Sequence, residues 1–207
     1  DADIYFINAL FTNTDVQPYI DQIRDRQPSI VAVVELPKAL KEWIISLGYK
    51  ELVTLESKYD SQWFFARADR ADFVSEMGID DVFPYPIGHI LYEGIHILLI
   101  HPYPGILWWL GENQHMSFSQ TRTIIDDYRA RWEHFIVIGD FNSSVFSPLF
   151  QHYFWDFQTP IHYTWQRWSI AALPIDHAIS DIPLGITPQP RTSSDRFALV
   201  VDMNHTY

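Results

Sequence analysis

The sequence predicts an α/β fold in which two mixed β-sheets pack as a sandwich with helices on the outer faces. Residues 1–50 alternate apolar runs with segments whose apolar residues recur at helical intervals, and residues 51–101 consist mainly of short strand-like pieces. No internal repeat or long linker divides the 207 residues. We therefore expect a single domain over 1–207, which is long enough to bury a sizeable core.

The chain opens as a strand, a helix and a second strand. DIYFINAL at 3–10 reads as a strand, and Thr14 and Gln17 have the spacing of a capping box at the start of the helix that follows. SIVAVVE at 29–35 contains a β-branched run that is apolar throughout. Such a run predicts a strand that is buried on both faces and carries Glu35 at its tip.

A second helix is expected between Pro37, which suits a first helical position, and Gly48, which suits the stop. The sequence then changes to short strand-like pieces, interrupted by a Pro- and Gly-rich stretch at 84–94. The further expected elements are strands at 51–56, 62–67 and 95–101, a helix from about 117 to 132, a strand at 135–142, a short helix opened by Ser147–Pro148, and strands at 162–166, 174–180 and 196–203.

Composition limits the chemistry and the partners. The chain has no cysteine, which excludes disulfides, thiolate metal sites and thiol nucleophiles. Its formal net charge is −12 with no lysine or arginine run, so a phosphate ligand must be held locally. The longest apolar stretches fall short of the roughly 20 residues that cross a bilayer. The sequence begins at Asp1, close to the first expected strand, so we expect that upstream residues were removed. The chain would then be a soluble domain, which leaves open that it is the exported or membrane-tethered part of a longer protein.

Polar side chains stand at the ends of several expected strands. Each has a structural explanation by itself, because carboxylates and amides commonly end strands and begin turns. If these ends share one edge of the sheets, however, their side chains converge in a cleft of the kind where α/β folds bind ligands. The residues are Asn8, Glu35, His101, Asp140, Asn142, Asp176, His177 and Asp195.

The order of five segments resembles the endonuclease/exonuclease/phosphatase superfamily. NALFTN, VVELP, IVIGDFN and PIDHAI are followed by SSD ahead of an apolar strand. The opening N-x4-N spacing is similar to that of a bacterial branch. The resemblance covers nearly the whole chain, is most specific at GDFN (139–142) and IDH (175–177), and is weakest over 50–95. It implies a DNase I-like four-layer α/β sandwich and the hydrolysis of phosphate esters with Mg²⁺ or Mn²⁺.

The resemblance also implies a role for several residues. Glu35 looks like the principal metal ligand, with Asn8 beside it and Asp195 completing the site. These oxygen donors suit a hard cation such as Mg²⁺. Asp140 and Asn142 match the pair that orients or activates the attacking water and touches the scissile phosphate.

Two further matches concern phosphate binding and a carboxylate–histidine pair. His101 is similar to a histidine that hydrogen-bonds phosphate oxygens, and Asp176 matches the carboxylate that orients the last catalytic histidine. Asp176 and His177 are neighbours on an expected strand, so their side chains point to opposite faces. We expect one of the two to be structural.

The closing motif departs from the family pattern. The family has Ser-Asp-His, whereas this chain has Ser194-Asp195-Arg196. Arginine keeps its proton at neutral pH and cannot act as a general acid or base there. Arg196 can instead clamp a substrate phosphate, which leaves reduced hydrolysis, or pair with Asp176. In the second case the domain is a catalytically inactive module that binds a phosphorylated ligand or a partner.

The substrate class stays open at this point. Net acidity disfavours tight binding of DNA, so a small or lipid-linked phosphodiester fits as well as a nucleic acid. The aromatic segment YPGILWWLG at 103–111 directly follows His101. Exposed, it would contact a lipid interface or an apolar part of the substrate, and buried, it would be ordinary packing. The oligomeric state is not indicated.

Overall fold

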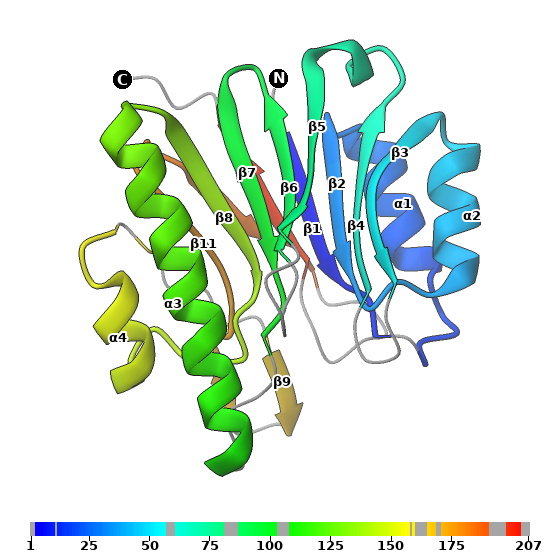
Figure 1. Ribbon diagram of the computed structural model, residues 1–207. Helices are drawn as coiled ribbons and strands as arrows, with labels where there is room; N and C mark the ends of the chain where they lie inside the picture. Colours follow the sequence, from blue (N-terminus) through cyan, green and yellow to red (C-terminus); the bar gives the residue numbers. More distant parts are fainter. Residues whose placement is uncertain are drawn as a thin grey trace.

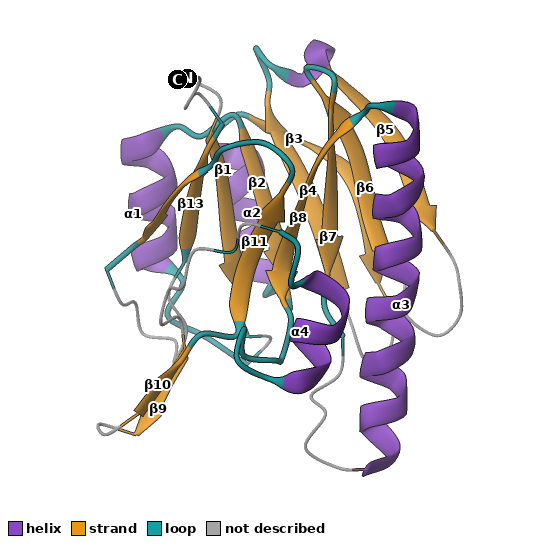
Figure 2. Ribbon diagram, turned by 90° about the vertical axis from the view of Figure 1, so that its left-hand side faces the viewer, coloured by secondary structure: helices purple, strands orange, loops and turns teal. Residues whose placement is uncertain are grey.

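The computed structural model describes residues 3–10, 12–56, 61–80, 87–102, 108–157, 159, 165–168, 171–190 and 198–203. Its helices are α1 (Gln17–Arg26), α2 (Lys38–Ser46), α3 (Trp108–Arg131), α4 (Pro148–Phe154) and the short 3-10 helix η1 (Ala71–Phe73). The strands form two sheets and a separate ribbon made of β9 (Trp165–Trp168) and β10 (Ala171–Leu173) (Figure 1, Figure 2).

The two sheets share one design. The six-stranded sheet has the order β12-β13-β1-β2-β4-β3 and contains β1 (Asp3–Asn8), β2 (Ile30–Val34), β3 (Tyr49–Glu56), β4 (Ser61–Arg67), β12 (Gly185–Pro188) and β13 (Leu199–Asp202). The five-stranded sheet has the order β11-β8-β7-β6-β5 and contains β5 (Val74–Asp80), β6 (Ile87–Tyr92), β7 (Ile95–Ile100), β8 (His134–Asp140) and β11 (Asp176–Ser180). Each sheet has one parallel pair, β1 with β2 and β7 with β8, among antiparallel pairs.

Strand β2 shows why its sequence is apolar throughout. Ile30, Ala32 and Val34 point into the core between the two sheets, whereas Val31 and Val33 face the helices. All five side chains are fully buried. Burial of each Val or Ile contributes roughly 1.5–3 kcal/mol, so a polar residue at any of these positions would be costly.

The helices cover the outer face of each sheet, which gives four layers (Figure 2). The outer face of the six-stranded sheet is covered by Tyr19, Ile20 and Ile23 of α1 and by Leu40 and Ile44 of α2. The outer face of the five-stranded sheet is covered by Phe118, Ile125 and Tyr128 of α3 and by Phe150, Tyr153 and Phe154 of α4. The predicted fold class, two mixed sheets in a sandwich with helices outside, is confirmed.

Several predicted elements need correction. The capping box at Thr14 and Gln17 does not form: α1 begins at Gln17, and its N-cap Val16 makes no side-chain hydrogen bond. Pro18 explains this, because a proline has no N–H for an interior turn and is tolerated only in the first turn. Pro37 is the N-cap of α2 rather than its first residue, while Gly48 follows the end of the helix with φ +90.

The largest errors concern α3 and the middle of the chain. Helix α3 begins at Trp108 rather than near 117. The stretch 84–94, read as a break, contains β6 and the hairpin turn that joins it to β7. Strands β5, β10 and β12 were not predicted. In the part of the chain that the structure describes, no helix combines the length and the apolarity needed to cross a membrane.

Candidate functional site

Four predicted site residues meet at one edge of the sandwich. Asn8 ends β1, Glu35 follows β2, His101 follows β7 and Asp140 ends β8. The two parallel pairs run in the same direction, so their carboxyl ends lie together at the lower edge in Figure 1. Asn8 Nδ2 donates a hydrogen bond of 2.8 Å to Asp140 Oδ2 and thereby joins the two sheets. His101 Nε2 lies 3.4 Å from Glu35 Oε1 and 3.9 Å from Asp140 Oδ2.

The Asp140 carboxylate is fully buried and held through both oxygens. Oδ1 accepts a hydrogen bond of 2.8 Å from the backbone N–H of Asn142, and Oδ2 accepts the bond from Asn8. A buried carboxylate needs such partners, because an unpaired charge inside a protein is strongly disfavoured. Its orientation is therefore fixed from two directions.

The backbone at Glu35 adopts a left-handed conformation, with φ of +54. The N–H of Glu35 donates to the carbonyl oxygen of Ser61 at 3.0 Å, and the N–H of Leu36 donates to Ser61 Oγ at 3.1 Å. A glutamate pays a steric penalty at positive φ, and such strain clusters at functional sites. These two hydrogen bonds to Ser61 hold the turn and so position the Glu35 side chain beside His101.

The loop that follows β8 is held by a residue from α3. Asn142 also has a left-handed backbone, with φ of +49, and its side-chain Nδ2 donates to the Pro102 carbonyl at 2.8 Å. Gln114 Nε2 donates to the carbonyl oxygens of Phe141 at 3.0 Å and Asn142 at 3.1 Å. Sequence reasoning missed Ser61 and Gln114. A helix started at 108 would have revealed Gln114 as a polar residue on a buried helix face.

Gly139 allows the two parallel strands β7 and β8 to approach each other beside the site. It lies opposite Ile100, and a Cβ atom added to Gly139 would lie 1.9 Å from the Ile100 carbonyl oxygen. No side chain fits in that space. The close approach of the strands therefore explains the glycine of the GDFN segment without reference to any ligand.

Asp176 and His177 lie in different surroundings. Asp176 is buried and pairs in register with Asp140, so the two carboxylates share a face of the sheet. His177 Nε2 lies 2.9 Å from the Ser143 carbonyl, and its ring packs against Phe141 with centroids 5.3 Å apart. These contacts give His177 a packing role.

The remaining predicted residues lie outside the described residues. These are Asp195 and Arg196, together with Ser194. The aromatic segment 103–111 is described only as backbone of α3 from Trp108 onward.

The donor set is compatible with a divalent cation. The Asn8 side-chain oxygen is buried and accepts no hydrogen bond from the described residues, and the Glu35 carboxylate lies at the same edge. An amide oxygen and a carboxylate are ligands that Mg²⁺ and Mn²⁺ accept. Among the described residues, His, Asp and Glu do not form a group of three that would hold an ion by itself. A cation bound at this edge would therefore have the Asn8 amide oxygen as a ligand beside the Glu35 carboxylate.

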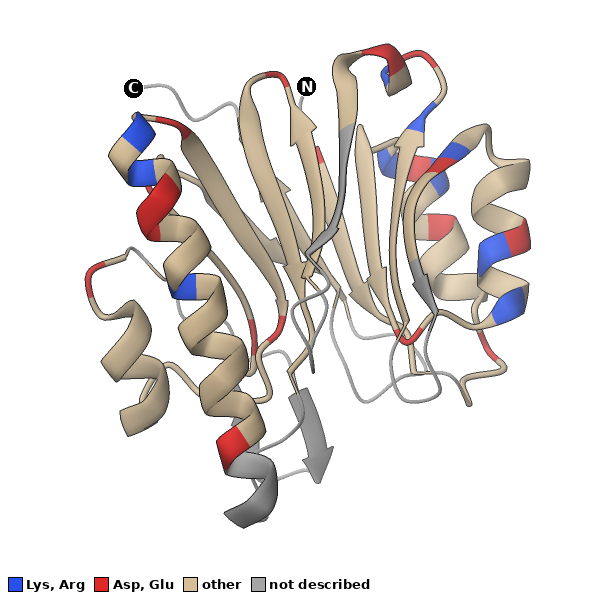
Figure 3. Ribbon diagram, in the orientation of Figure 1, with Lys and Arg blue, Asp and Glu red and all other residues tan. Residues whose placement is uncertain are grey.

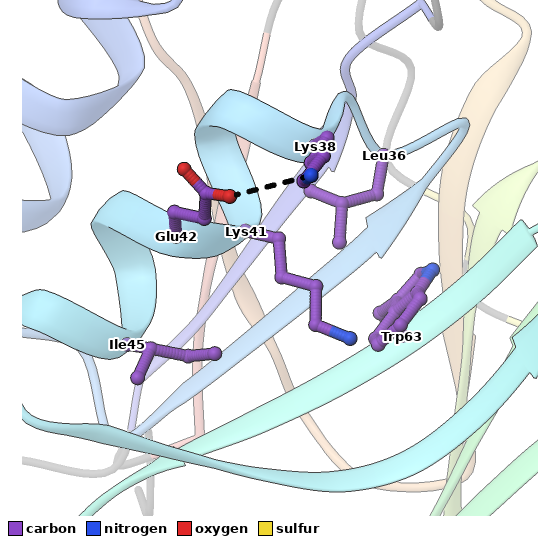
Figure 4. A pocket seen from close by; sticks show the side chains of 6 residues that line it. All are labelled: Leu36, Lys38, Lys41, Glu42, Ile45 and Trp63. Atoms are coloured by element: carbon purple, nitrogen blue, oxygen red, sulfur yellow. Dashed lines mark ion pairs between the residues drawn. The ribbon is translucent and has the colours of Figure 1, made fainter.

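Among the residues that the structure describes, few positive charges lie near this edge (Figure 3). In Figure 3 the described Lys and Arg residues lie mostly on α3 and toward the upper end of the sandwich, and near the lower edge they lie on α2. A cavity of about 370 Å³ lies along α2, and its lining begins at Leu36, the residue after Glu35 (Figure 4). It is lined by Leu36, Lys38, Lys41, Glu42, Ile45 and Trp63.

The two lysines of this cavity differ in availability. Lys41 Nζ lies 2.9 Å from Glu51 Oε2 and 3.6 Å from the centre of the Trp63 ring, so it is already engaged. The Lys38 side chain is 89% exposed and lies 3.9 Å from Glu42, an exposed pair that contributes little. Lys38 is thus the more available cation of the cavity.

Comparison with known proteins identifies the fold. No family model matches the sequence, and no curated protein matches it. In contrast, 209 chains of solved structures match the fold. One is an endonuclease/exonuclease/phosphatase family protein from Bacteroides thetaiotaomicron, with a TM-score of 0.66 and 14% identity over 97% of this chain and 96% of that one.

Two other similar structures carry specific names. The 3′ phosphatase NExo from Neisseria, bound to a product DNA hairpin, has a TM-score of 0.72 and 15% identity over 98% of this chain and 99% of that one. A mannosyl-6-phosphatase from Bacteroides thetaiotaomicron has a TM-score of 0.66 and 13% identity over 98% of this chain and 99% of that one. The chain therefore has the DNase I-like fold of the endonuclease/exonuclease/phosphatase superfamily.

Proposed function

We propose that the chain is a divalent-metal-dependent phosphoesterase whose catalytic centre lies at the carboxyl ends of β1, β2, β7 and β8. The observation that carries the proposal is the convergence of Asn8, Glu35, His101 and Asp140 from two different sheets, with Asn8 bonded to Asp140 at 2.8 Å. The convergence of an amide, an imidazole and two carboxylates at four strand ends favours a functional site over packing alone. Solved structures of this fold include phosphatases, which supports the same reaction class.

Each site residue that the structure describes has a role in this proposal. Asp140, fixed through both oxygens, accepts a proton from the attacking water or orients it. His101 donates a hydrogen bond to a phosphate oxygen. Asn142 contacts the scissile phosphate beside Asp140, and Asp176, directly opposite Asp140 on β11, is the carboxylate that orients the side chain at position 196.

Mg²⁺ or Mn²⁺ would be held by Glu35 and the Asn8 side-chain oxygen, with Asp195 as a further donor. When bound, the cation would neutralise charge on the phosphate. Without it, the acidic edge would repel a phosphate ester. We therefore expect hydrolysis to require the cation.

The substrate that fits best is a small phosphate ester rather than a long nucleic acid. A polyanion gains most of its affinity from many basic contacts, and the described residues offer little positive charge at this edge beyond α2. The similar structures act on or bind different esters, a DNA hairpin product in one case and a mannosyl phosphate by name in another. The fold by itself therefore does not indicate which phosphate ester is the substrate.

A direct assay tests the proposal. Purified protein is incubated with bis-p-nitrophenyl phosphate and a panel of phosphomonoesters, with Mg²⁺ or Mn²⁺ and with a chelator. We expect metal-dependent release of product that falls by at least about 10²-fold in Glu35→Gln and Asp140→Asn. Hydrolysis that survives the chelator, or survives both substitutions, would contradict the proposed site.

Arg196 supports a second candidate, a phosphate-binding module without turnover. An arginine cannot exchange a proton at neutral pH, and it would suit Asp176 as a partner. Arg196→His separates the two: a large gain from a null background supports the module, whereas measurable native activity supports the enzyme.

A further inference from the structure

We propose that Gln114 is a positioning residue that sets the orientation of the Asp140 carboxylate through a single peptide group. The inference rests on the proposed function, since it assigns Asp140 a role in hydrolysis. Gln114 lies on α3, and the resemblance gives it no role. It does not touch the reacting atoms and acts only through the loop after β8.

The geometry forms a chain of two hydrogen bonds across one peptide plane. Gln114 Nε2 donates to the Phe141 carbonyl oxygen at 3.0 Å. That carbonyl and the N–H of Asn142 belong to the same planar peptide group. The N–H of Asn142 in turn donates to Asp140 Oδ1 at 2.8 Å. The side chain on α3 therefore fixes the plane whose opposite end holds the carboxylate.

The same amide holds the next peptide group. Gln114 Nε2 also donates to the Asn142 carbonyl at 3.1 Å, and one amide nitrogen carries the two hydrogens required. Strand β8 has ended at Asp140, so these two carbonyls lie beyond its strand ladder. Gln114 is buried, with 5% exposure, so water cannot readily replace it.

The loop needs this support because its backbone is not in a preferred conformation. Asn142 has φ of +49, a region that asparagine tolerates but does not favour. Without the hydrogen bond from Gln114 to its carbonyl oxygen, the Phe141–Asn142 peptide could rotate and turn that oxygen toward Asp140. The carboxylate would then lose one of its two fixed partners, while the bond from Asn142 Nδ2 to Pro102 would keep the substrate-contacting side chain near its place.

Isosteric substitutions test the proposal. Gln114→Met keeps the length of the side chain and suits a helix but removes the donor, and Gln114→Glu keeps the shape but places an acceptor against two carbonyl oxygens. We expect kcat for bis-p-nitrophenyl phosphate to fall by about 10- to 100-fold in Gln114→Met, as for other supporting residues of active sites, with KM little changed. We expect kcat to fall further in Gln114→Glu.

The matched control is Gln120→Met on the same helix. The Gln120 side-chain nitrogen is buried and donates no hydrogen bond within the described residues, so its loss should leave kcat unchanged. Thermal unfolding of all variants separates folding from positioning. Hydrogen exchange of the peptide spanning 140–147 provides a readout independent of turnover, and we expect faster exchange there in Gln114→Met than in Gln120→Met.

The outcomes are distinct. If the wild-type protein hydrolyses no ester, the proposed function fails, and the exchange measurement still decides whether Gln114 orders the loop. If the wild-type protein is active and Gln114→Met retains its kcat, the positioning role is wrong. A rise in KM with unchanged kcat, or equal exchange in the two methionine variants, would also overturn it. Should Gln114→Met not fold, the same comparison is made with Gln114→Glu.

Discussion

At the scale of single residues, Glu35 shows that the site is built at some cost to stability. Its φ of +54 is unfavourable for any residue with a Cβ atom. Glu35→Gly removes that strain together with the carboxylate that lies beside His101, while glycine adds entropy to the unfolded chain. We expect the free energy of unfolding to rise by roughly 0.5–1 kcal/mol and metal-dependent hydrolysis to disappear, measured by urea unfolding and by the phosphodiester assay.

A second glutamate provides the control. Glu93 has φ of +50 in the hairpin turn between β6 and β7, next to Gly94. Glu93→Gly should give a similar gain in stability, since that turn favours glycine, and should leave hydrolysis unchanged. A loss of stability in Glu35→Gly would show that the contacts of its side chain outweigh its backbone strain.

At the scale of elements, the contact of β7 with β8 depends on Gly139. Because a Cβ atom would lie 1.9 Å from the Ile100 carbonyl oxygen, Gly139→Ala must push the two strands apart. We expect a loss of more than about 3 kcal/mol in the free energy of unfolding, at the upper end of overpacking costs. Urea unfolding measures it.

Gly94→Ala separates crowding from backbone conformation. Gly94 has φ of +83 with no atom within 4 Å of an added Cβ, so only the conformational penalty of about 1–2 kcal/mol applies. If the two alanine variants lose equal stability, the close approach of β7 and β8 does not control the fold.

The elements also differ in how well the sequence predicts them. Buried strands such as β2 and β8 are readable because both faces are apolar, and their polar tips, Glu35 and Asp140, mark the site directly. Edge and short strands such as β5 and β12 carry no such signal, since tertiary pairing forms them. Gln114 and Ser61 act through backbone groups of distant segments. Such contacts exist only once the layers have packed, so spacing along the chain cannot reveal them.

At the scale of the whole molecule, acid should destabilise the fold through a buried histidine pair. His89 Nε2 lies 3.0 Å from His96 Nδ1 and 3.1 Å from the Tyr128 hydroxyl. Burial, and secondarily the charge of His96, lowers the pKa of His89 to about 4. The unfolded chain therefore binds the proton more readily, and stability that is complete above about pH 6.5 is lost as the pH falls toward 4, by up to about 3 kcal/mol.

Urea unfolding between pH 7.5 and 4.5 measures this loss. His89→Gln keeps a hydrogen-bonding side chain but does not titrate, so its stability should vary less with pH than that of the wild type. His152→Gln, at an exposed position on α4, should keep the wild-type slope. An unchanged slope in His89→Gln would assign the acid sensitivity to other groups.

The distribution of charge over the molecule makes a prediction about substrate size. The chain carries a net charge of −12, and its described cations near the site lie on α2. A substrate with a second phosphate should therefore depend on Lys38, while a single phosphodiester should not. We expect Lys38→Glu to raise KM for a dinucleotide with a terminal phosphate by roughly 2- to 5-fold at low salt, the size of an exposed charge interaction, and to leave KM for bis-p-nitrophenyl phosphate unchanged.

Lys50→Glu is the matched charge reversal, because Lys50 lies at the start of β3, at the end of the sheet opposite the site. It should change neither KM, since screening removes interactions over such distances at moderate ionic strength. Raising the salt concentration should also erase the effect of Lys38→Glu. If the two reversals raise KM equally, the overall charge of the chain repels the substrate, and the cavity beside α2 has no part in its recognition.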